Sequence, residues 1–362
     1  MPAPSDHLAR LRLIRSDNIG PITYFQLLAR FGSAQAALDA VPDLAARGGG
    51  RAPRLASRAE IEREIAAVER LGARYLFLGQ GPYPLLLAEL ETAPPALIVK
   101  GDLNLLDKMS VALVGARNAS AAACRFARQL AQGLGAAGAV IVSGLARGID
   151  SAAHDGALDT GTIAVIAGGI DIVYPPENEA RQRAIAERGL LVAEQPPGIE
   201  PRARHFPYRN RIIAGLTHGT VVIEAAPKSG SLITARHAAE FGREVMAVPG
   251  SPLDPRAQGC NQLIREGATL VQTAEDVLEA VSPLRPRPFR QRELDYAAPG
   301  PSADADGAAR RAVTDLLGPT PVPVDELIRQ SGLAPAAVQT VLLELELAGR
   351  LERYAGGRVS LA

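Results

Sequence analysis

Between residues 96 and 280 the sequence alternates short apolar runs with helical segments, and this alternation restricts the possible folds more than any other feature. Strands are expected at 96–99, 111–114, 139–142, 162–166, 190–193, 220–224, 244–248 and 269–271. Helices are expected at 121–137, 149–159, 177–188, 210–216, 232–241, 258–266 and 274–280. Continuous β-branched runs are typical of parallel strands that are buried on both faces. The pattern therefore predicts an α/β fold with an extended, doubly wound, mostly parallel sheet.

The segment before this domain has a different pattern. Helices are expected at 8–14, 23–31 and 61–71, with a loose basic loop at 47–58 and a short strand at 75–78. These short elements predict a small helical domain over residues 1–80, followed by the α/β domain over residues 81–282.

The segment after the α/β domain has two parts. Residues 283–307 are rich in Pro, Arg, Ala and Asp, which predicts a flexible linker. Residues 308–362 contain helical patterns at 308–317, 324–330 and 334–347, then a hairpin pattern at 350–354 and 358–361. Three helices followed by a two-stranded wing predict a winged-helix domain.

The third helix of this domain is the one that would read a DNA groove. Between residues 334 and 347 it has no Lys or Arg, but it does have Glu344 and Glu346. Groove reading needs cationic or bidentate donors. We therefore expect this domain to have a protein-contact or regulatory role rather than to read duplex DNA.

Composition excludes several classes of protein. The formal net charge is +0, so any binding to nucleic acid has to come from a local basic patch. Cys124 and Cys260 have neither metal-site nor disulfide spacing. No apolar run resembles a signal peptide or a membrane span, which predicts a soluble, cytoplasmic protein without a membrane partner.

Common cofactor motifs are missing. The turn after the strand at 111–114 has a single Gly in VGARNAS, so the G-x-G-x-x-G dinucleotide motif is absent. Lys228-Ser229-Gly230-Ser231 lacks the residue order of a phosphate-binding P-loop. Asp150 and His154 lie four residues apart without a third metal ligand. We therefore expect Asp150 to cap its helix and orient the turn, and His154 to be a helix histidine whose hydrogen bonds are satisfied. The sequence predicts no cofactor and no metal.

The stretch AVIVSGLARGIDSAAHDGAL, residues 139–158, leads from a strand through a tight turn into a helix. Such a turn offers backbone N–H groups and the positive end of a helix, which suits a phosphate. Three other turns have related features, and in a parallel sheet they would share one edge. The candidate binding residues are Arg117, Ser143, Gly144, Arg147, Gly148, Phe206, Arg209, Asn210, Arg211, Lys228, Ser229, Gly230 and Ser231.

Several cationic turns in a row favour the backbone of a polyanion over a single nucleotide. Phe206 and Tyr208 lie among these arginines and could stack on exposed bases. The competing interpretation is structural, with Phe206 in the core and the arginines paired with carboxylates.

At these residues the chain resembles the DprA (Smf) family of DNA-processing proteins. The resemblance covers residues 83–280 and rests on five motifs in order. They are SGLARGIDSAAHDGAL (143–158), GGIDIVYPPEN (168–178), FPYRNRIIAGL (206–216), VVIEAAPKSGSLITARHAAEFGREVMAVPG (221–250) and GCNQLIREGA (259–268).

This resemblance implies an extended Rossmann-like domain that binds single-stranded DNA and forms a homodimer. It also implies protection of incoming single strands, loading of a RecA-type recombinase during natural transformation, and no catalytic residues. Carried over by motif, the DNA groove uses Ser143, Gly144, Arg147, Phe206, Arg209, Asn210, Arg211 and the turn Lys228–Ser231. The N-terminal segment resembles the SAM-like domain of the family.

The rival hypothesis is a nucleotide-processing enzyme similar to nucleoside-monophosphate hydrolases. Its support is Glu224, which follows Gly219-Thr220 at the end of a strand near Gly-rich turns. Against it are the length of the arginine cluster and the lack of a compact acid–base pair.

Overall fold

The computed structural model describes residues 4–282, 305–354 and 356–362. The described chain divides into two compact units, one of residues 4–63 and 305–362 and the other of residues 64–282. Most of the linker expected at 283–307 lies outside the described residues. The fourfold division of the chain stays a proposal, although the structure groups the first and last parts together.

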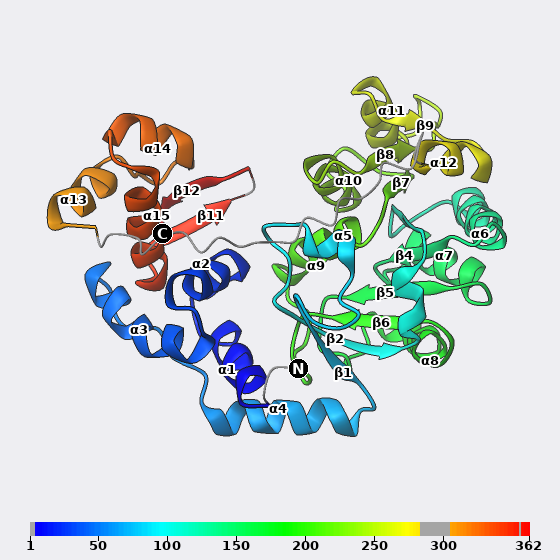
Figure 1. Ribbon diagram of the computed structural model, residues 1–362. Helices are drawn as coiled ribbons and strands as arrows, with labels where there is room; N and C mark the ends of the chain where they lie inside the picture. The colour runs from blue at the N-terminus through cyan, green and yellow to red at the C-terminus, as the bar shows by residue number, and fades with distance from the viewer. Residues whose placement is uncertain (1–3, 283–304, 355) are drawn as a thin grey trace. The chain divides into compact units, whose positions relative to one another are not determined.

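The larger unit contains a nine-stranded sheet with the order β1-β2-β6-β5-β4-β3-β7-β8-β9 (Figure 1). The strands are β1 (Arg74–Phe77), β2 (Ala96–Gly101), β3 (Ser110–Gly115), β4 (Val140–Ser143), β5 (Thr162–Ile166), β6 (Leu190–Ala193), β7 (Gly219–Ile223), β8 (Glu244–Ala247) and β9 (Thr269–Leu270). The seven strands from β6 to β9 in this order are parallel, and β2 pairs antiparallel with both β1 and β6. The predicted doubly wound, mostly parallel sheet is confirmed.

Helices cover both faces of this sheet. One face carries α5 (Leu85–Ala88), α9 (His205–Gly215), α10 (Ser231–Glu240) and α11 (Gln258–Arg265), and the other carries α6 (Ala121–Ala136), α7 (Ile149–Ala157), α8 (Glu179–Arg188) and α12 (Ala274–Val281). Side chains alternate along each strand, and this explains the two layers. In β3, Ala112 and Val114 pack in the core under α5, α9, α10 and α11, whereas Val111 and Leu113 pack in the core under α6, α7 and α12. Short 3-10 helices lie at η1 (Leu103–Asp107) and η2 (Pro176–Asn178).

The helix α9 begins five residues earlier than the sequence analysis expected, at His205 instead of Asn210. Pro207 is compatible with this start, because proline is tolerated in the first turn, where its missing N–H has no helical partner. The motif FPYRNR therefore lies on a helix and not in a loop, so its side chains point in different directions.

The smaller unit combines the two ends of the chain. Its N-terminal helices are α1 (Pro4–Ile14), α2 (Pro21–Phe31) and α3 (Ala34–Arg47), and α4 (Arg58–Arg70) continues into the larger unit. The C-terminal elements are α13 (Gly307–Asp315), β10 (Val322–Pro323), α14 (Val324–Ser331), α15 (Pro335–Leu347), β11 (Leu351–Tyr354) and β12 (Arg358–Leu361), which confirm the predicted winged helix.

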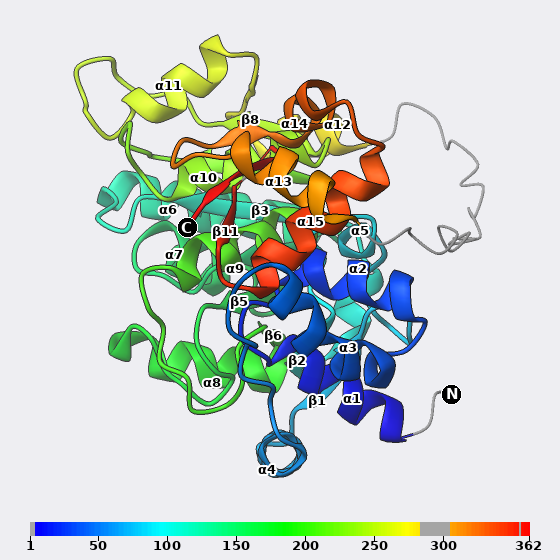
Figure 2. The ribbon, with the colours of Figure 1, turned by 90° about the vertical axis from the view of Figure 1, so that its left-hand side faces the viewer.

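The helix α15 is apolar on both sides, and each side has its own partner. Val338, Val341 and Leu345 belong to the core of the winged helix. Leu343 and Leu347 instead belong to the core of the N-terminal helices, and α15 lies beside α2 and α3 (Figures 1 and 2). These two faces of α15 are both apolar, and each is buried against its own partner.

Polar contacts and close packing reinforce this interface. The Asn18 amide donates to the Leu347 carbonyl at 3.3 Å, and Arg350 donates to the Gly48 carbonyl at 3.0 Å. A Cβ on Gly48 would lie 2.1 Å from the Glu344 carbonyl oxygen, so only glycine allows this approach. On this face α15 contacts the N-terminal helices of the same chain, while the role of the winged helix toward other molecules stays a prediction.

His154 of α7 is fully buried, and it is held in one tautomer. The Thr162 hydroxyl donates to the Ile141 carbonyl at 2.9 Å, so His154 Nδ1 has to donate to Thr162 Oγ1 at 2.7 Å. His154 Nε2 then lies in the core without a hydrogen-bond partner, so the prediction of a satisfied histidine is wrong for this nitrogen. Burial lowers the pKa of His154 from 6.5 to about 3.

This pKa shift predicts a loss of stability in acid. Below pH 6.5 His154 binds a proton in the unfolded chain but stays neutral in the folded chain. The contribution of His154 to the free energy of unfolding is therefore fully present above pH 6.5 and is lost progressively as the pH falls toward 3. The expected slope is about 1.4 kcal/mol per pH unit in that window. Urea unfolding at several pH values checks this for the wild type against His154→Gln, whose stability should lack this contribution; parallel pH profiles would contradict it.

Candidate functional site

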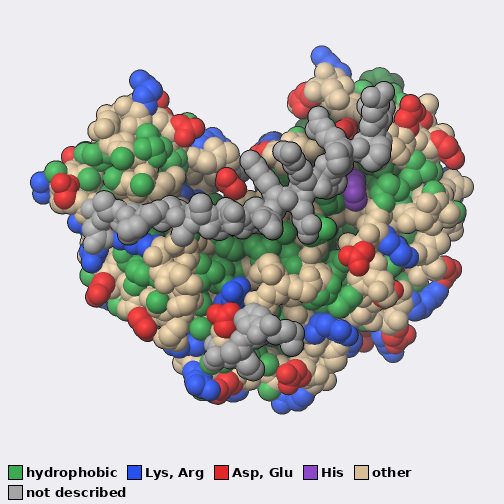
Figure 3. Space-filling model, viewed as in Figure 1, with side chains coloured by type: hydrophobic (Ala, Val, Ile, Leu, Met, Phe, Trp, Pro, Cys, Tyr) green, Lys and Arg blue, Asp and Glu red, His purple; other side chains and the backbone are tan. Residues whose placement is uncertain are grey.

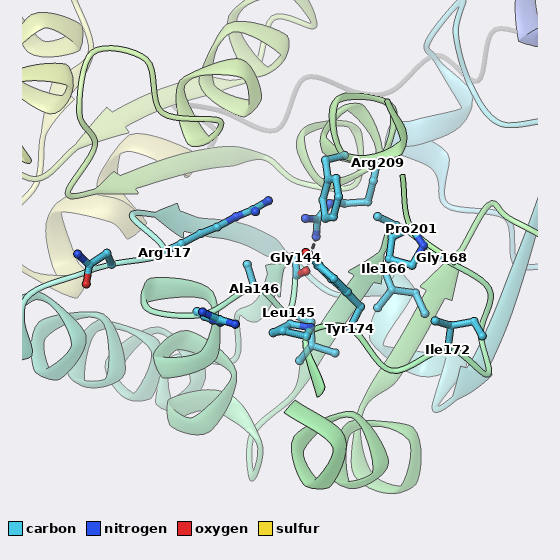
Figure 4. Close-up of a pocket in the computed structure, with 15 residues that line it drawn as sticks. Arg117, Gly144, Leu145, Ala146, Ile166, Gly168, Ile172, Tyr174, Pro201 and Arg209 are labelled. Carbon is cyan, nitrogen blue, oxygen red and sulfur yellow. Dashed lines mark hydrogen bonds between the residues drawn. The ribbon is translucent and has the colours of Figure 1, made fainter. Parts of the chain in front are cut away.

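A cavity of about 410 Å³ opens at the carboxyl ends of β3, β4 and β5. Its walls are the turn after β3 with Arg117, the turn 144–147 after β4, the loop 166–175 after β5, and the start of α9 with Phe206 and Arg209. Figure 4 shows Arg117 extending toward Arg209 across this space. Open α/β sheets bind their ligands at this edge.

Two glycines permit the turn after β4. A Cβ on Gly144 would lie 1.8 Å from the guanidinium of Arg209, and Gly148 has a φ of +72 with the Ala116 carbonyl oxygen 2.3 Å from any added Cβ. Ser143 stays in the strand, fully buried, and its hydroxyl donates to the Leu113 carbonyl at 2.6 Å. Ser143 and both glycines therefore shape the turn rather than face the cavity with a side chain.

The turn does not offer all the backbone donors that the sequence analysis expected. The amides of Gly144 and Ala146 both donate to Asp150 Oδ2, each at 3.2 Å. A buried carboxylate of the chain thus binds these two amides in place of a phosphate, and the expectation of free N–H groups is wrong for these two residues. Burial raises the pKa of Asp150, while the nearby Arg209 lowers it.

Arg209 forms the floor of the cavity. It is buried, and its Nη1 donates to the carbonyl oxygen of Gly144 (Figure 4). The same nitrogen donates to the Val165 carbonyl at 2.7 Å. Its Nε has no hydrogen-bond partner in the structure. Burial lowers the pKa of Arg209 to about 10, which leaves it charged at neutral pH.

Two further arginines and two aromatic rings lie around the opening. The guanidinium of Arg117 lies 4.9 Å from the ring centroid of Phe206, within cation–π range. The Tyr174 ring is 5.7 Å from Phe206 and 47% exposed. Arg147 is exposed and forms an ion pair with Glu177. Among the described residues that line the cavity, none is Asp or Glu.

The other candidate residues lie away from the cavity. Asn210 donates its amide to the Gly230 carbonyl at 3.2 Å, which ties α9 to the turn Lys228–Ser231 after β7. In that turn Lys228 is exposed and Ser229 and Ser231 share a hydrogen bond of 2.7 Å. This turn follows a different strand, so it would extend a binding surface rather than complete the cavity.

Arg211 points into the protein. Its side chain is 8% exposed, and it donates to Glu194 Oε1 at 2.5 Å and to the Thr92 carbonyl. Arg209 and Arg211 therefore bind different parts of the protein, although only one residue separates them in the sequence. The geometry gives Arg211 a structural partner in place of a phosphate.

The carboxylate of Glu224, on which the enzyme hypothesis rests, also has hydrogen-bond partners within the chain. Its carboxylate accepts from the Ser120 hydroxyl at 2.6 Å and from the Ser120 amide at 2.8 Å, at the start of α6. Its backbone has a φ of +50, which L-residues rarely adopt. It lies where the sheet changes winding direction between β3 and β7, and it does not line the cavity.

Sequence reasoning singled out neither Tyr174 nor Asn178 as a site residue. Both belong to GGIDIVYPPEN, which entered the sequence analysis only as a motif. The available signal is the position of Tyr174, because a loop that follows a buried parallel strand lies at the ligand-binding edge of such a sheet.

Comparison with known proteins agrees with this picture. Residues 74–282 match the family described as DNA recombination-mediator protein A, which is more than half of the chain. The chain belongs to this family. Residues 4–67 match the DprA-like N-terminal HHH domain and residues 297–357 the DprA winged helix domain.

Individual members of the DprA family are similar over most of their length. DNA processing protein DprA of Streptococcus pneumoniae is 50% identical over 198 residues, which cover 54% of this chain and 70% of the relative. Protein Smf of Escherichia coli is 37% identical over 315 residues, covering 84% and 82%.

Two solved structures are also similar. The crystal structure of DNA processing protein A from S. pneumoniae has a TM-score of 0.62 at 37% identity, covering 77% of this chain and 98% of that chain. A structure of DNA processing protein A from Helicobacter pylori, described for its single-stranded DNA binding mode, has a TM-score of 0.52 at 30% identity, covering 57% and 94%.

The distribution of charged side chains over the surface is consistent with a basic site that is confined to one region of the protein. Lys and Arg are interspersed with Asp and Glu on the face shown in Figure 3, in keeping with the net charge of +0. In the described part of the chain no group of His, Cys, Asp and Glu could hold a metal ion. None of the described helices has the length and apolar character needed to cross a bilayer.

Proposed function

We propose that this DprA-family chain binds single-stranded DNA at the cavity after β3, β4 and β5, without marked sequence preference. The observation that carries the proposal is the convergence of Arg117, Arg147 and Arg209 on one cavity with the rings of Phe206 and Tyr174 at its opening. Arginines attract successive phosphates, and exposed aromatic faces stack on bases of any identity.

In this proposal arginine side chains make most of the contacts to the phosphates, because Asp150 already binds two backbone amides of the turn. Lys228 and the turn around it extend the surface along the sheet edge. Gly148, Ser143, Gly144 and Asn210 shape the backbone, and Arg211 supports the fold from inside.

The wider role that we propose follows family membership. The chain protects incoming single strands, acts as a homodimer, and helps to load a RecA-type recombinase in natural transformation. The experiment is recombinase filament formation on single strands coated with single-strand binding protein. Faster filament formation with this chain supports loading, whereas an unchanged rate contradicts it.

We also propose that the chain acts without catalysis. Glu224 supports this view, because its carboxylate serves Ser120 and α6 and lies away from the arginine cavity. Incubation with nucleoside monophosphates should release no free base. Base release that Glu224→Gln abolishes would restore the hydrolase hypothesis.

The binding proposal makes a first prediction at Arg117. Arg117→Ala should weaken binding to single strands by about 1.5–3 kcal/mol, roughly 10- to 150-fold, because it removes one charged contact and the cation–π partner of Phe206. The logarithmic salt slope should fall by about 0.7. Fluorescence anisotropy with labelled single-stranded and duplex DNA at several salt concentrations measures both quantities.

A matched control is Arg188→Ala. Arg188 is an exposed arginine at the C-terminal end of α8, and it forms an ion pair with Asp159. Its affinity should equal that of the wild type. If both variants lose affinity equally, the binding is distributed over the surface and the cavity is not the site.

A further inference from the structure

Asn178, at the end of η2, is a buried residue that joins two walls of the cavity. It is 2% exposed and does not itself line the cavity. Its Nδ2 donates to the carbonyl oxygen of Leu145 at 2.8 Å and approaches that of Ala146 at 3.5 Å. Its Oδ1 accepts from Arg181. The Ser151 hydroxyl lies 3.2 Å from the same oxygen and donates to the Ala146 carbonyl at 2.7 Å. The partners fix the orientation of the amide, because carbonyls only accept and a guanidinium only donates.

The turn that Asn178 holds has a strained backbone. Leu145 is completely buried and has a φ of +54, in the left-handed region that costs a leucine roughly 1–2 kcal/mol. Such a conformation persists only when its surroundings over-determine it. Asp150 binds the amides of Gly144 and Ala146 from one side, and Asn178 binds carbonyls of the same turn from the other.

Arg181, which donates to the Oδ1 atom of Asn178, is itself held in place. Arg181 is fixed by Asp155, with contacts of 2.6 Å and 2.9 Å, so the acceptor of Asn178 faces an anchored donor. Gln182, one residue further along α8, donates to the Ile172 carbonyl at 3.0 Å and so holds the loop that carries Tyr174. The start of α8 thus connects the loop wall with the turn that carries Arg147.

We infer that Asn178 is a positioning residue for the DNA site, which holds the turn 144–148 so that Arg147 faces the cavity opening. The inference rests on the proposed function, because it assigns Asn178 an effect on DNA that is transmitted through Arg147. A residue with only an acceptor or only a donor cannot replace it, since it serves a carbonyl pair and a guanidinium at once.

The test is Asn178→Asp, which keeps size and shape, keeps the acceptor for Arg181, and removes the donor to Leu145 and Ala146. We expect the affinity for single-stranded DNA to fall about tenfold, the value of one charged contact. The specific readout is a double-mutant cycle. Combined with Arg147→Ala, the variant should lose little more than the weaker-binding single variant, whereas with Arg117→Ala the two losses should multiply.

Multiplying losses with both arginines would overturn the inference, because Asn178 would then act on the fold at large. A matched control is Asn18→Asp in the smaller unit, which also removes an amide donor to a backbone carbonyl, that of Leu347. Its affinity for DNA should be unchanged. If it falls as much as that of Asn178→Asp, the effect at 178 is not specific.

A measurement without DNA separates this inference from the proposed function. Hydrogen exchange of the Gly144 and Ala146 amides should accelerate about tenfold in Asn178→Asp, since opening of the turn becomes easier. If the wild type does not bind DNA but this acceleration occurs, the function fails and the positioning role stands. Unchanged exchange overturns the positioning role. Should Asn178→Asp not fold, Arg181→Gln weakens the same connection and is judged by the same criteria.

Discussion

Arg211→Ala is expected to destabilise the larger unit by about 3–5 kcal/mol, because it breaks the buried ion pair between Arg211 and Glu194. The carbonyl of Thr92 loses its donor in the same step. Urea or thermal unfolding, followed by a probe in the sheet, measures the effect. DNA affinity should fall only in proportion to the fraction of unfolded protein.

A control for this prediction is Arg188→Ala, whose ion pair with Asp159 is exposed on both sides, 51% and 83%. Exposed pairs contribute about 0–1 kcal/mol, so its unfolding should be close to that of the wild type. The opposite pattern for Arg211→Ala, full stability with a uniform loss of DNA affinity, would return Arg211 to the binding surface where the sequence analysis placed it.

Leu347→Ala is expected to destabilise the smaller unit by about 2–5 kcal/mol, the usual range for a leucine truncated in a core. Leu347 is 0% exposed and packs in the same cluster as Leu13, Leu27 and Leu44 of the N-terminal helices. Hydrogen exchange should therefore accelerate in α2 and α3 as well as in α15, although these elements are far apart in sequence.

The control here is Leu253→Ala, since Leu253 is 91% exposed and its truncation should change stability little. Acceleration confined to the winged helix, with α2 and α3 unaffected, would contradict the view that the two ends of the chain unfold together.

The sequence predicted the sheet well because buried strands have a local signature. The run 162–166 is rich in β-branched residues and the run 190–193 is continuously apolar, and the structure places strands at these same residues. The helix α3 was not predicted, since Pro42 lies inside it and proline removes a helical hydrogen bond. Its apolar stripe of Ala37, Leu38, Val41 and Leu44 outweighs that cost by burial against the N-terminal core and α15.

The candidate site was predictable in its parts but not in its directions. The motifs identified Arg117, Arg147, Phe206 and Arg209, and the structure brings these four together at one cavity. Arg211 was grouped with Arg209 because the two are neighbours in sequence. On a helix, residues two apart differ by roughly 200°, so Arg209 reaches the cavity while Arg211 reaches Glu194.

By itself, the sequence determined the alternation of strands and helices, the glycine turns at their ends and the supply of arginines, because each of these depends on neighbouring residues. Only the tertiary structure decided which anion each donor meets. Asp150 takes the amides of Gly144 and Ala146, and Glu224 takes Ser120 from 104 residues away. Short local patterns do not encode such pairings, since they arise when the packing of distant segments brings a carboxylate within hydrogen-bond distance.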